Sequence, residues 1–456
     1  MAFPAYGLTH RATATGRRGM VASGHPLASL AGVRILLDGG NAIDAAVATA
    51  AALNVVEPYM SGIGGVGYMH IYSARQKEHK ICDYVGLTPA ATDIDMYVEE
   101  SQQDRGPMSP LVPAACAGWM ESLRRYGTMD AADVFAPAIE LAEGGFALTV
   151  KNSSFFAGSV NDLRKYPSSA STYLVDGRCP EPGEVLIQQD LAETYRAVAA
   201  DGPDVFYGGA IGDVIAAFMA EMGGLLTKQD LIDNKPQWLD PLGVDYRDFT
   251  IWAPPAPCQA IQYLETLKLL EGFDIAGMGH NTADTLHTFI EAVKLACIDR
   301  IQYATLPDSP TAGLLSDGYC QQRRTLIGET AAVSMGDTFR TEQQKGEVAP
   351  GDPEPWMKNE CTTHFDTIDA EGNAVACTQS LGSGFGSAMV VPGTGITLNN
   401  FMRWFDNVDG SPNAIGPSKK NEMCVSPAQV WDKDGLRLLI GTPGSYGILQ
   451  TTPQMI

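Results

Sequence analysis

The pattern of apolar and polar residues in the first part of the chain predicts two helices followed by a strand. Residues 26–37 begin with a proline suited to a first helical turn, and residues 42–54 are rich in alanine. Asn41 can cap the second helix, and Asp44 places a negative charge near the positive end of its dipole. Because small side chains allow close packing, we expect this helix to be buried. A glycine-rich turn leads into a strand predicted at residues 67–72.

The middle of the chain is mostly helical in pattern. Apolar residues and helix-ending glycines predict further helices after Pro113 in the segment 111–126, and at residues 133–144, 261–270 and 285–300. The pattern of residues 150–205 is mixed and predicts no single element. Residues 328–358 are polar and rich in Glu, Gly and Pro, which is typical of an exposed connector.

After this connector, the pattern changes from helical to alternating. Residues 362–368 and 374–380 each alternate between apolar and polar side chains, and the short turn between them predicts a β-hairpin. Two more strands are predicted at residues 428–431 and 436–440. The order of elements is therefore mostly helical and then mostly β, which favours one large α/β unit.

The start of the hairpin carries a candidate nucleophile. Two threonines, Thr362 and Thr363, follow Cys361 where the connector meets the strand. Threonine is common in strands, so this pattern alone is more typical of structure than of chemistry. A threonine hydroxyl needs a base to act as a nucleophile. If the bond before Thr362 were cut, its own α-amine, with an ordinary pKa of about 7.7–8.0, could serve as that base.

Composition narrows the classes of function. The 456 residues are 45% hydrophobic and 18% charged, which is enough apolar material for a large core and argues against disorder. The net charge is −22, and such a chain would be repelled by phosphate groups. We therefore expect neither a nucleic acid nor an anionic membrane as a partner.

The cysteines and the N-terminal segment favour a cytoplasmic protein without a cofactor. The nine cysteines form no CxxC pair and are expected to be reduced thiols. The N-terminus has no apolar signal-peptide region, and no membrane-spanning window of about 18 apolar residues is expected. The histidines and cysteines lack the spacing of a metal site. We therefore expect no bound metal, and His364 is not expected to be a metal ligand. Residues 62–65 do not match a phosphate-binding loop.

Several segments, taken in order, resemble one enzyme family. They are residues 39–47, 54–58 and 61–65 near the start, residues 290–300 in the middle, and residues 362–365, 369–375, 398–400 and 441–444 near the end. Each segment is weak evidence alone, but their order and spacing are specific. On these residues the chain resembles the gamma-glutamyltransferase family of N-terminal-nucleophile hydrolases.

The resemblance implies a fold and a processing event. The fold would be an α/β, four-layer αββα sandwich of the N-terminal-nucleophile hydrolases. The precursor would cleave between Cys361 and Thr362 into a large subunit, residues 1–361, and a small subunit, residues 362–456. Members of the family normally continue beyond the region that ends here at Ile456, so the family's C-terminal segment is expected to be missing. The resemblance leaves a homodimer open.

The resemblance also implies roles for individual residues. The hydroxyl of Thr362 would attack an amide carbonyl, and Thr363 and Ser380 match positions that orient the nucleophile. The turn at residues 441–445 lies where the family supplies backbone N–H groups to an oxyanion, which implies Gly444 and Ser445 as donors. Neither step would need a cofactor.

The chain departs from the family where γ-glutamyl substrates are held. The family's carboxylate-binding arginine is replaced by Val85, and Arg403 follows Asn400 where an acid would bind the substrate amine. A substrate-binding asparagine is replaced by Gly382. The usual pair of serines becomes residues 423–424, Met and Cys.

These departures predict a different substrate and leave three functions open. A buried arginine facing an ammonium group would be strongly unfavourable, whereas Arg403 could pair with a carboxylate on the acyl group. We therefore expect an amidohydrolase or acyltransferase that acts on a small acidic acyl amide, such as an oxamate-like, glutaryl-like or cephalosporin-side-chain-like compound. The alternatives are a true γ-glutamyl transferase or glutathione hydrolase, and an inactive relative that serves as a scaffold.

Overall fold

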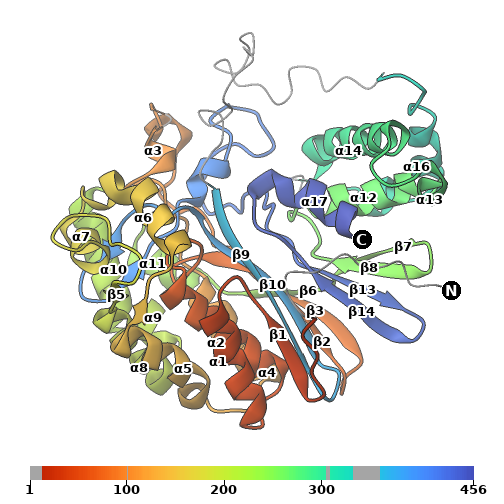
Figure 1. The fold of residues 1–456 in the computed structure, drawn as a ribbon. Coiled ribbons are helices and arrows are strands. Elements are labelled where there is room, and N and C mark those ends of the chain that lie inside the picture. The colour runs from red at the N-terminus through yellow and green to blue at the C-terminus, as the bar shows by residue number, and fades with distance from the viewer. Residues whose placement is uncertain (1–12, 100, 305–308, 332–359) are drawn as a thin grey trace.

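The computed structural model describes residues 13–99, 101–304, 309–331 and 360–456, and shows two stacked antiparallel sheets between two layers of helices (Figure 1). The larger sheet has the strand order β1-β9-β10-β2-β3-β6, and the smaller has the order β14-β13-β8-β7. This arrangement confirms the predicted αββα sandwich. Of the predicted connector, residues 332–359 lie outside the described residues.

The larger sheet joins segments from both ends of the chain. Its strands are β1 (Gly19–Ala22), β2 (Val66–Ser73), β3 (Glu78–Tyr84), β6 (Gln237–Leu239), β9 (Glu360–Asp369) and β10 (Ala374–Ser383). The predicted hairpin is confirmed as β9 and β10, which lie between β1 and β2. The predicted small subunit therefore provides the centre of a sheet whose remaining strands come from the predicted large subunit.

One helical layer covers the outer face of the larger sheet. It contains α1 (Pro26–Leu37), α2 (Ala42–Val56), α4 (Ala115–Tyr126), α5 (Ala131–Gly144) and α8 (Gln189–Asp201). Every residue of α2 is buried, as its alanine content predicts. Asn41 and Asp44 form a reciprocal capping box at its start. Helix α2 contacts both β9 and β10, so it supports the strands that carry the candidate nucleophile.

The smaller sheet and its helices form the other half of the sandwich. Its strands are β7 (Leu242–Tyr246), β8 (Phe249–Ala253), β13 (Ala428–Asp432) and β14 (Gly435–Ile440). The helices on this side are α12 (Ile261–Leu270), α13 (Ile275–Met278), α14 (Ala283–Tyr303), α15 (Thr311–Leu314), α16 (Asp317–Arg324) and α17 (Ile448–Met455). Sequence analysis predicted β13, β14, α12 and α14 to within a few residues.

Aromatic and polar side chains fill the space between the two sheets. Tyr72 of β2 packs on Trp431 of β13 with ring centroids 4.3 Å apart. The side-chain amide of Gln429 donates a hydrogen bond of 3.0 Å to the backbone carbonyl of His70. These contacts cross from one sheet to the other and set their relative position.

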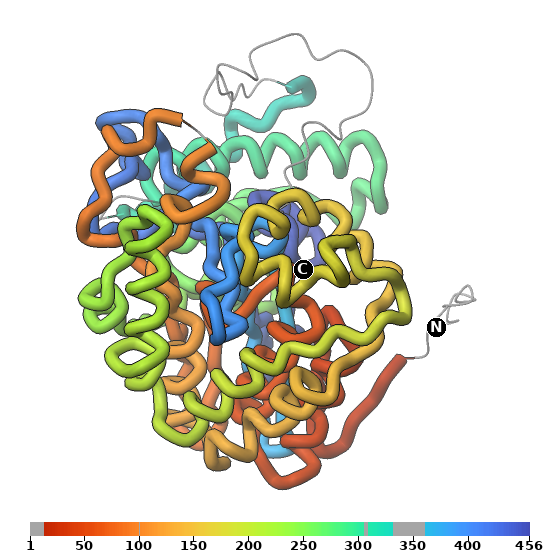
Figure 2. Tube along the Cα trace, turned by 90° about the vertical axis from the view of Figure 1, so that its left-hand side faces the viewer, coloured from red at the N-terminus to blue at the C-terminus, as the bar shows by residue number. Residues whose placement is uncertain are grey.

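The remaining helices and strands complete the structure around one end of the sandwich. They are η1 (Ile94–Met96), α3 (Ser101–Asp104), β4 (Phe146–Ala147), α6 (Val150–Leu163), α7 (Pro167–Tyr173), β5 (Val185–Leu186), α9 (Asp204–Tyr207), α10 (Ala210–Met222), α11 (Lys228–Asp233), β11 (Val390–Val391), β12 (Ile396–Thr397), η4 (Phe401–Trp404) and η5 (Ser445–Gly447). Figure 2 shows the late segments, in blue, enclosed by helices from the earlier part of the chain. The helix predicted after Pro113 begins at Ala115 and ends at Tyr126.

The expectation about membrane-spanning windows was wrong in one place. Residues 204–222 are long and apolar enough to meet a length-and-composition test, with a mean hydropathy of 1.4. Gly208 and Gly209 divide this stretch into α9 and α10, and its apolar residues Ile211 and Phe218 join the main core. Core helices pass the same test, so this stretch is weak evidence for a membrane segment.

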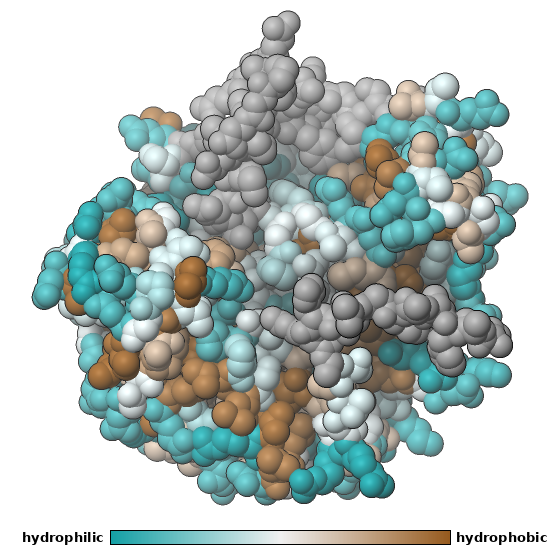
Figure 3. All heavy atoms as spheres, viewed as in Figure 1, coloured by the Kyte–Doolittle hydropathy of each residue, from teal (hydrophilic) through white to brown (hydrophobic). Residues whose placement is uncertain are grey.

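On the face shown in Figure 3, exposed apolar side chains gather over the helices near α1.

Candidate active site

The candidate nucleophile lies at a break in the pairing of the two central strands. Thr362 is near the start of β9 and is only 5% exposed. Strand β10 places two residues, Ser380 and Leu381, opposite Thr362 alone, which is the geometry of a β-bulge. The register before the bulge brings Ser380 opposite Thr362, and the extra residue, Leu381, shifts the pairing so that Gly382 lies opposite Cys361.

Ser380 links the hydroxyl of Thr362 to the peptide bond before it. The Thr362 hydroxyl donates a hydrogen bond of 3.3 Å to Ser380 Oγ. The Ser380 hydroxyl in turn donates a short hydrogen bond to the carbonyl oxygen of Cys361. The backbone N–H of Gly382 donates to the same Oγ at 2.8 Å. The serine hydroxyl thus uses its one donor and both acceptor positions, which fixes its orientation.

Thr363 lies on the opposite face of the strand and has different surroundings. Successive strand residues point to opposite faces, so Thr363 is directed away from Ser380. A methyl group on Gly24 would lie 3.5 Å from Thr363 Oγ1 and 2.8 Å from Glu57 Oε2. Burial raises the pKa of the Glu57 carboxyl, and Lys151 opposes this rise from 3.4 Å away. Glu57 falls within residues 54–58, one of the family-like segments of the sequence, and no local pattern predicts its place near Thr363.

The predicted oxyanion turn lies close to β9. Gly444 has a φ of +122° and Ser445 a φ of +53°, so the turn needs two left-handed residues in succession. The helical turn η5, which begins at Ser445, contacts β9. Gly441 packs directly on the ring of His364, since a methyl group there would lie 2.3 Å from Nδ1. The roles of Gly444 and Ser445 as oxyanion donors remain predictions.

The side chain of His364 packs against this turn. Its Nδ1 lies 2.8 Å from Thr378 Oγ1 and its Nε2 lies 3.0 Å from Asp366 Oδ1. Both ring nitrogens therefore have a partner, which fixes the ring in its position against Gly441. This arrangement suits a positioning role better than that of a mobile base.

Two predicted substrate-binding residues occupy structural positions. The side chain of Asn400 is fully buried, and its Oδ1 accepts from the backbone N–H of Ser383 at 2.9 Å. Its Nδ2 donates to the carbonyl of Asp104 at 2.7 Å. Gly382 has a φ of +103°, and a methyl group there would lie 2.2 Å from Asn400 Oδ1. In this structure a side chain at position 382 would collide with Asn400, which explains the glycine.

Arg403 is paired with a carboxylate rather than isolated. Its Nε lies 3.3 Å from Asp104 Oδ1, and its Nη1 donates to Ser383 Oγ at 3.2 Å. A second arginine, Arg105, donates from Nη1 to the carbonyl of Gly384 at 2.8 Å. Sequence analysis missed Arg105 because the residues around it match no motif. Only the folded chain brings it to the turn that follows β10.

The other replaced family positions are part of the core. Val85 is 3% exposed and belongs to the apolar cluster between the smaller sheet and its neighbours. Met423 and Cys424 are buried in the same cluster. These side chains therefore pack with other apolar residues at positions that bind polar substrate groups in the resembled family.

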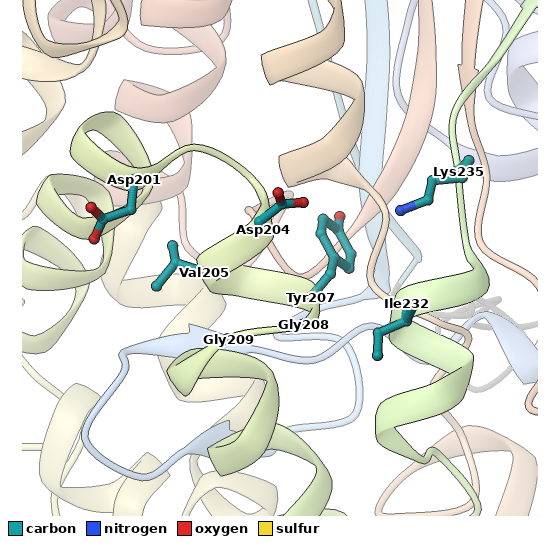
Figure 4. A pocket seen from close by; sticks show the side chains of 8 residues that line it. All are labelled: Asp201, Asp204, Val205, Tyr207, Gly208, Gly209, Ile232 and Lys235. Carbon is teal, nitrogen blue, oxygen red and sulfur yellow. The ribbon is translucent and has the colours of Figure 1, made fainter.

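A surface hollow of ≈ 480 Å³ lies away from this site (Figure 4). It is bordered by α8, α9 and α11, and Asp204 and Lys235 are among its lining residues. None of the residues predicted for catalysis lines it. The candidate chemistry is instead defined by the buried contacts around Thr362.

Comparisons with known proteins identify the family. The sequence profile described as Gamma-glutamyltranspeptidase matches residues 28–456. The chain belongs to this family and is an enzyme of the N-terminal-nucleophile type. The expected family membership is thereby confirmed.

Individual relatives cover almost the whole chain. The chain is 36% identical to the Acylase ACY 1 proenzyme of Pseudomonas sp. (strain V22), over 97% of this chain and 79% of that protein. It is 34% identical to the Glutathione hydrolase proenzyme of Pseudomonas sp. (strain A14), over 95% of this chain and 77% of that protein. The crystal structure of cephalosporin acylase from Bacillus halodurans matches with a TM-score of 0.86 and 32% identity, over 100% of this chain and 83% of that chain.

Proposed function

We propose that the chain cleaves itself between Cys361 and Thr362, and that Thr362 then acts as the N-terminal nucleophile of an amide hydrolase or acyltransferase. The observation that carries this proposal is the hydrogen-bonded path from the Thr362 hydroxyl through Ser380 to the Cys361 carbonyl. It joins the attacking group to the bond that must break. The two curated relatives are both named proenzymes, which supports processing of this chain as well.

The same path supplies a route for the proton in self-cleavage. As Thr362 Oγ bonds to the carbonyl carbon of Cys361, its proton passes to Ser380, and the Ser380 proton passes to the carbonyl oxygen. Collapse of this intermediate breaks the C–N bond, and the nitrogen takes up the proton to become the free α-amine of Thr362. Water then hydrolyses the ester left between Cys361 and Thr362, which restores the hydroxyl.

In turnover the freed amine would serve as the base. It would accept the Thr362 hydroxyl proton as Oγ attacks the substrate amide, and then return a proton to the leaving amine. Backbone N–H groups of Gly444 and Ser445 would stabilise the oxyanion, and Thr363 and Ser380 would orient the nucleophile. Water would release the acyl group in hydrolysis, and an amine would accept it in transfer.

The substrate we propose is an amide of a small acidic acyl group. A γ-glutamyl group carries an ammonium group, and Arg403 stands where the family would bind it with an acid. Val85 supplies no charge for the α-carboxylate and is buried in the core. The two fragments, 1–361 and 362–456, would stay together because they share both sheets. A cytoplasmic location is likewise proposed.

Intact-mass analysis of the purified chain tests the processing step. We expect two fragments that divide before Thr362, and a single uncut chain for Thr362→Ala. A Thr362→Ser variant keeps a hydroxyl and should still cleave. Cleavage of the alanine variant at the same bond would contradict the proposal.

Substrate assays separate the alternatives. A processed enzyme should hydrolyse a glutaryl anilide faster than a γ-glutamyl anilide at equal concentration. A faster γ-glutamyl reaction would favour a true γ-glutamyl enzyme. A chain that stays uncut on long incubation and hydrolyses neither compound would favour a scaffold.

A further inference from the structure

The position of Cys361 marks where the acyl part of a substrate must lie, an argument that rests on the proposed function. During self-cleavage the carbonyl of Cys361 is the first acyl group attached to Thr362 Oγ. During turnover the substrate acyl group forms the same ester with the same oxygen. The surroundings of Cys361 in the uncut chain therefore outline the acyl pocket of the processed enzyme.

These surroundings include the turn that follows β10. A methyl group on Gly384 would lie 3.6 Å from Cys361 Sγ and 3.2 Å from Ser159 Oγ, so the turn passes directly beside the Cys361 side chain. Arg105 is close enough to Cys361 for the two side chains to interact electrostatically. The acyl pocket is thus bordered by a glycine, which leaves room, and by a cation.

The guanidinium groups of Arg105 and Arg403 both donate hydrogen bonds to this turn. Arg105 donates from Nη1 to the carbonyls of Gly384, at 2.8 Å, and of Gly386. Arg403 donates to the neighbouring Ser383 hydroxyl at 3.2 Å. The two arginines repel each other, since Arg403 helps burial to lower the pKa of Arg105. Their side chains are 23% and 16% exposed, so both are largely removed from water.

Each arginine has an acidic neighbour, and Arg403 keeps hydrogen-bonding capacity beside its own. Asp162 lies 3.4 Å from Arg105 Nε, and Asp104 lies 3.3 Å from Arg403 Nε. The buried Nε of Arg403 nevertheless has no hydrogen bond among the described residues. Guanidinium groups bind carboxylates through paired N–H donors, so a carboxylate between these arginines would relieve their repulsion and could accept from the Arg403 Nε.

We infer that Arg105 and Arg403 form the far end of the acyl pocket and bind a terminal carboxylate, so that the preferred acyl group is one arm of a dicarboxylic acid. Arg105 is the principal contact because it donates to the carbonyl of Gly384, the residue that passes beside the Cys361 side chain. The acyl carbonyl would meet Thr362 while the distal carboxylate meets the turn at residues 383–386.

The test compares two anilides that differ only at the distal group. One carries a glutaryl group, and the other carries the same group with its carboxylate replaced by a carboxamide. The measured quantity is the ratio of the two kcat/KM values. We expect Arg105→Gln and Arg403→Gln to lower this ratio, the first by roughly 10- to 100-fold, because a charge-assisted contact is lost. Arg178→Gln, at an exposed arginine paired with Glu184, is the matched control and should keep the wild-type ratio.

Intact mass accompanies each assay, because processing reports a folded site. If Arg105→Gln is not processed, Arg105→Lys replaces it, and loss of the planar donor fork should still lower the ratio. A processed, active Arg105 variant with the ratio of the Arg178→Gln control would overturn the inference and leave the proposed function intact. A wild-type chain that is not cleaved, or that hydrolyses neither anilide, would overturn both.

Discussion

The Ser380 hydroxyl donates a short hydrogen bond to the carbonyl oxygen of Cys361. A donor on this oxygen stabilises the negative charge that develops there when the peptide carbonyl is attacked. The same hydroxyl is the acceptor for Thr362, so one serine serves both partners of the reaction. The register of the preceding pairs, which ends with Gln379 opposite Thr363, brings Ser380 opposite Thr362, and the bulge then places Gly382 opposite Cys361.

Removal of the Ser380 hydroxyl should slow self-cleavage. We expect the rate for Ser380→Ala to fall by roughly 100-fold, the usual effect of losing one oxyanion donor. Ser380→Thr keeps a hydroxyl and should retain most of the rate. A time course of intact mass measures both, with Ser154→Ala on the exposed face of α6 as the control. Cleavage of Ser380→Ala at the control rate would show that this contact is not used.

A side chain at position 382 should destabilise the protein. Gly382 has a φ of +103°, and a methyl group there would lie 2.2 Å from Asn400 Oδ1. Backbone strain and steric overlap together predict a cost of roughly 2–5 kcal/mol for Gly382→Ala. Gly393 also has a positive φ, +69°, but open space at its Cβ position. Gly393→Ala should therefore cost only about 1 kcal/mol.

Thermal unfolding compares these two alanine variants. The Gly382 variant should unfold at a clearly lower temperature than the Gly393 variant. Equal midpoints would mean that Asn400 can move aside, and a binding asparagine at position 382 would then be compatible with this fold.

The free energy of unfolding should decrease as the pH is lowered, because a pair of histidines lies between the two sheets. His70 Nε2 lies 3.3 Å from His79 Nδ1, and burial lowers both pKa values, that of His79 to about 4. In the unfolded chain both groups titrate near 6.5. The unfolded state therefore binds protons first as pH falls, and the pair destabilises the fold progressively from about pH 6.5 towards pH 4.

Urea unfolding at pH 7 and pH 5 measures this effect. Glu57 and Glu422 have raised pKa values and contribute the opposite slope, so the useful quantity is the difference between variants. His79→Gln should lose less stability than wild type between the two pH values. His280→Gln, at an exposed site, should behave as wild type. An unchanged pH dependence for His79→Gln would exclude the pair as the cause.

The elements that could be predicted from the sequence are those with local signals. Helices α1 and α2 have a proline, a capping box and a glycine stop within the segment itself, and the β9–β10 hairpin has a short turn between alternating residues. Thr362 could be proposed because it opens a strand and belongs to an ordered series of family-like segments. Each of these local signals lies within a few residues of the element that it predicts.

The contacts that define the site are long-range and could not be predicted in this way. The bulge beside Ser380 depends on the register between two strands. Arg403 pairs with Asp104, which is about 300 positions away in the sequence. Arg105 comes from the same distant segment and contacts the turn that follows β10. Sequence analysis therefore identified the unusual charge at position 403 but not its partner.

The backbone of the predicted oxyanion turn carries strain that a glycine should relieve. Ser445 has a φ of +53°, and its hydroxyl is buried without a hydrogen-bond partner among the described residues. Left-handed geometry costs a non-glycine residue about 1 kcal/mol, and an unpaired buried hydroxyl about 1 kcal/mol more. Ser445→Gly should therefore raise the thermal midpoint. Ser418, exposed and with a φ of +48°, offers the matched control, since Ser418→Gly relieves only the backbone.

Activity and stability should respond differently to this change. The proposed oxyanion donors are backbone N–H groups, which glycine retains, so Ser445→Gly should keep kcat within a few-fold of wild type. Its thermal midpoint should exceed that of Ser418→Gly, and the difference reports the cost of the buried hydroxyl. A large loss of kcat with unchanged processing would instead show that the Ser445 side chain takes part in turnover. No gain over the Ser418 control would mean that the hydroxyl finds a partner in solution.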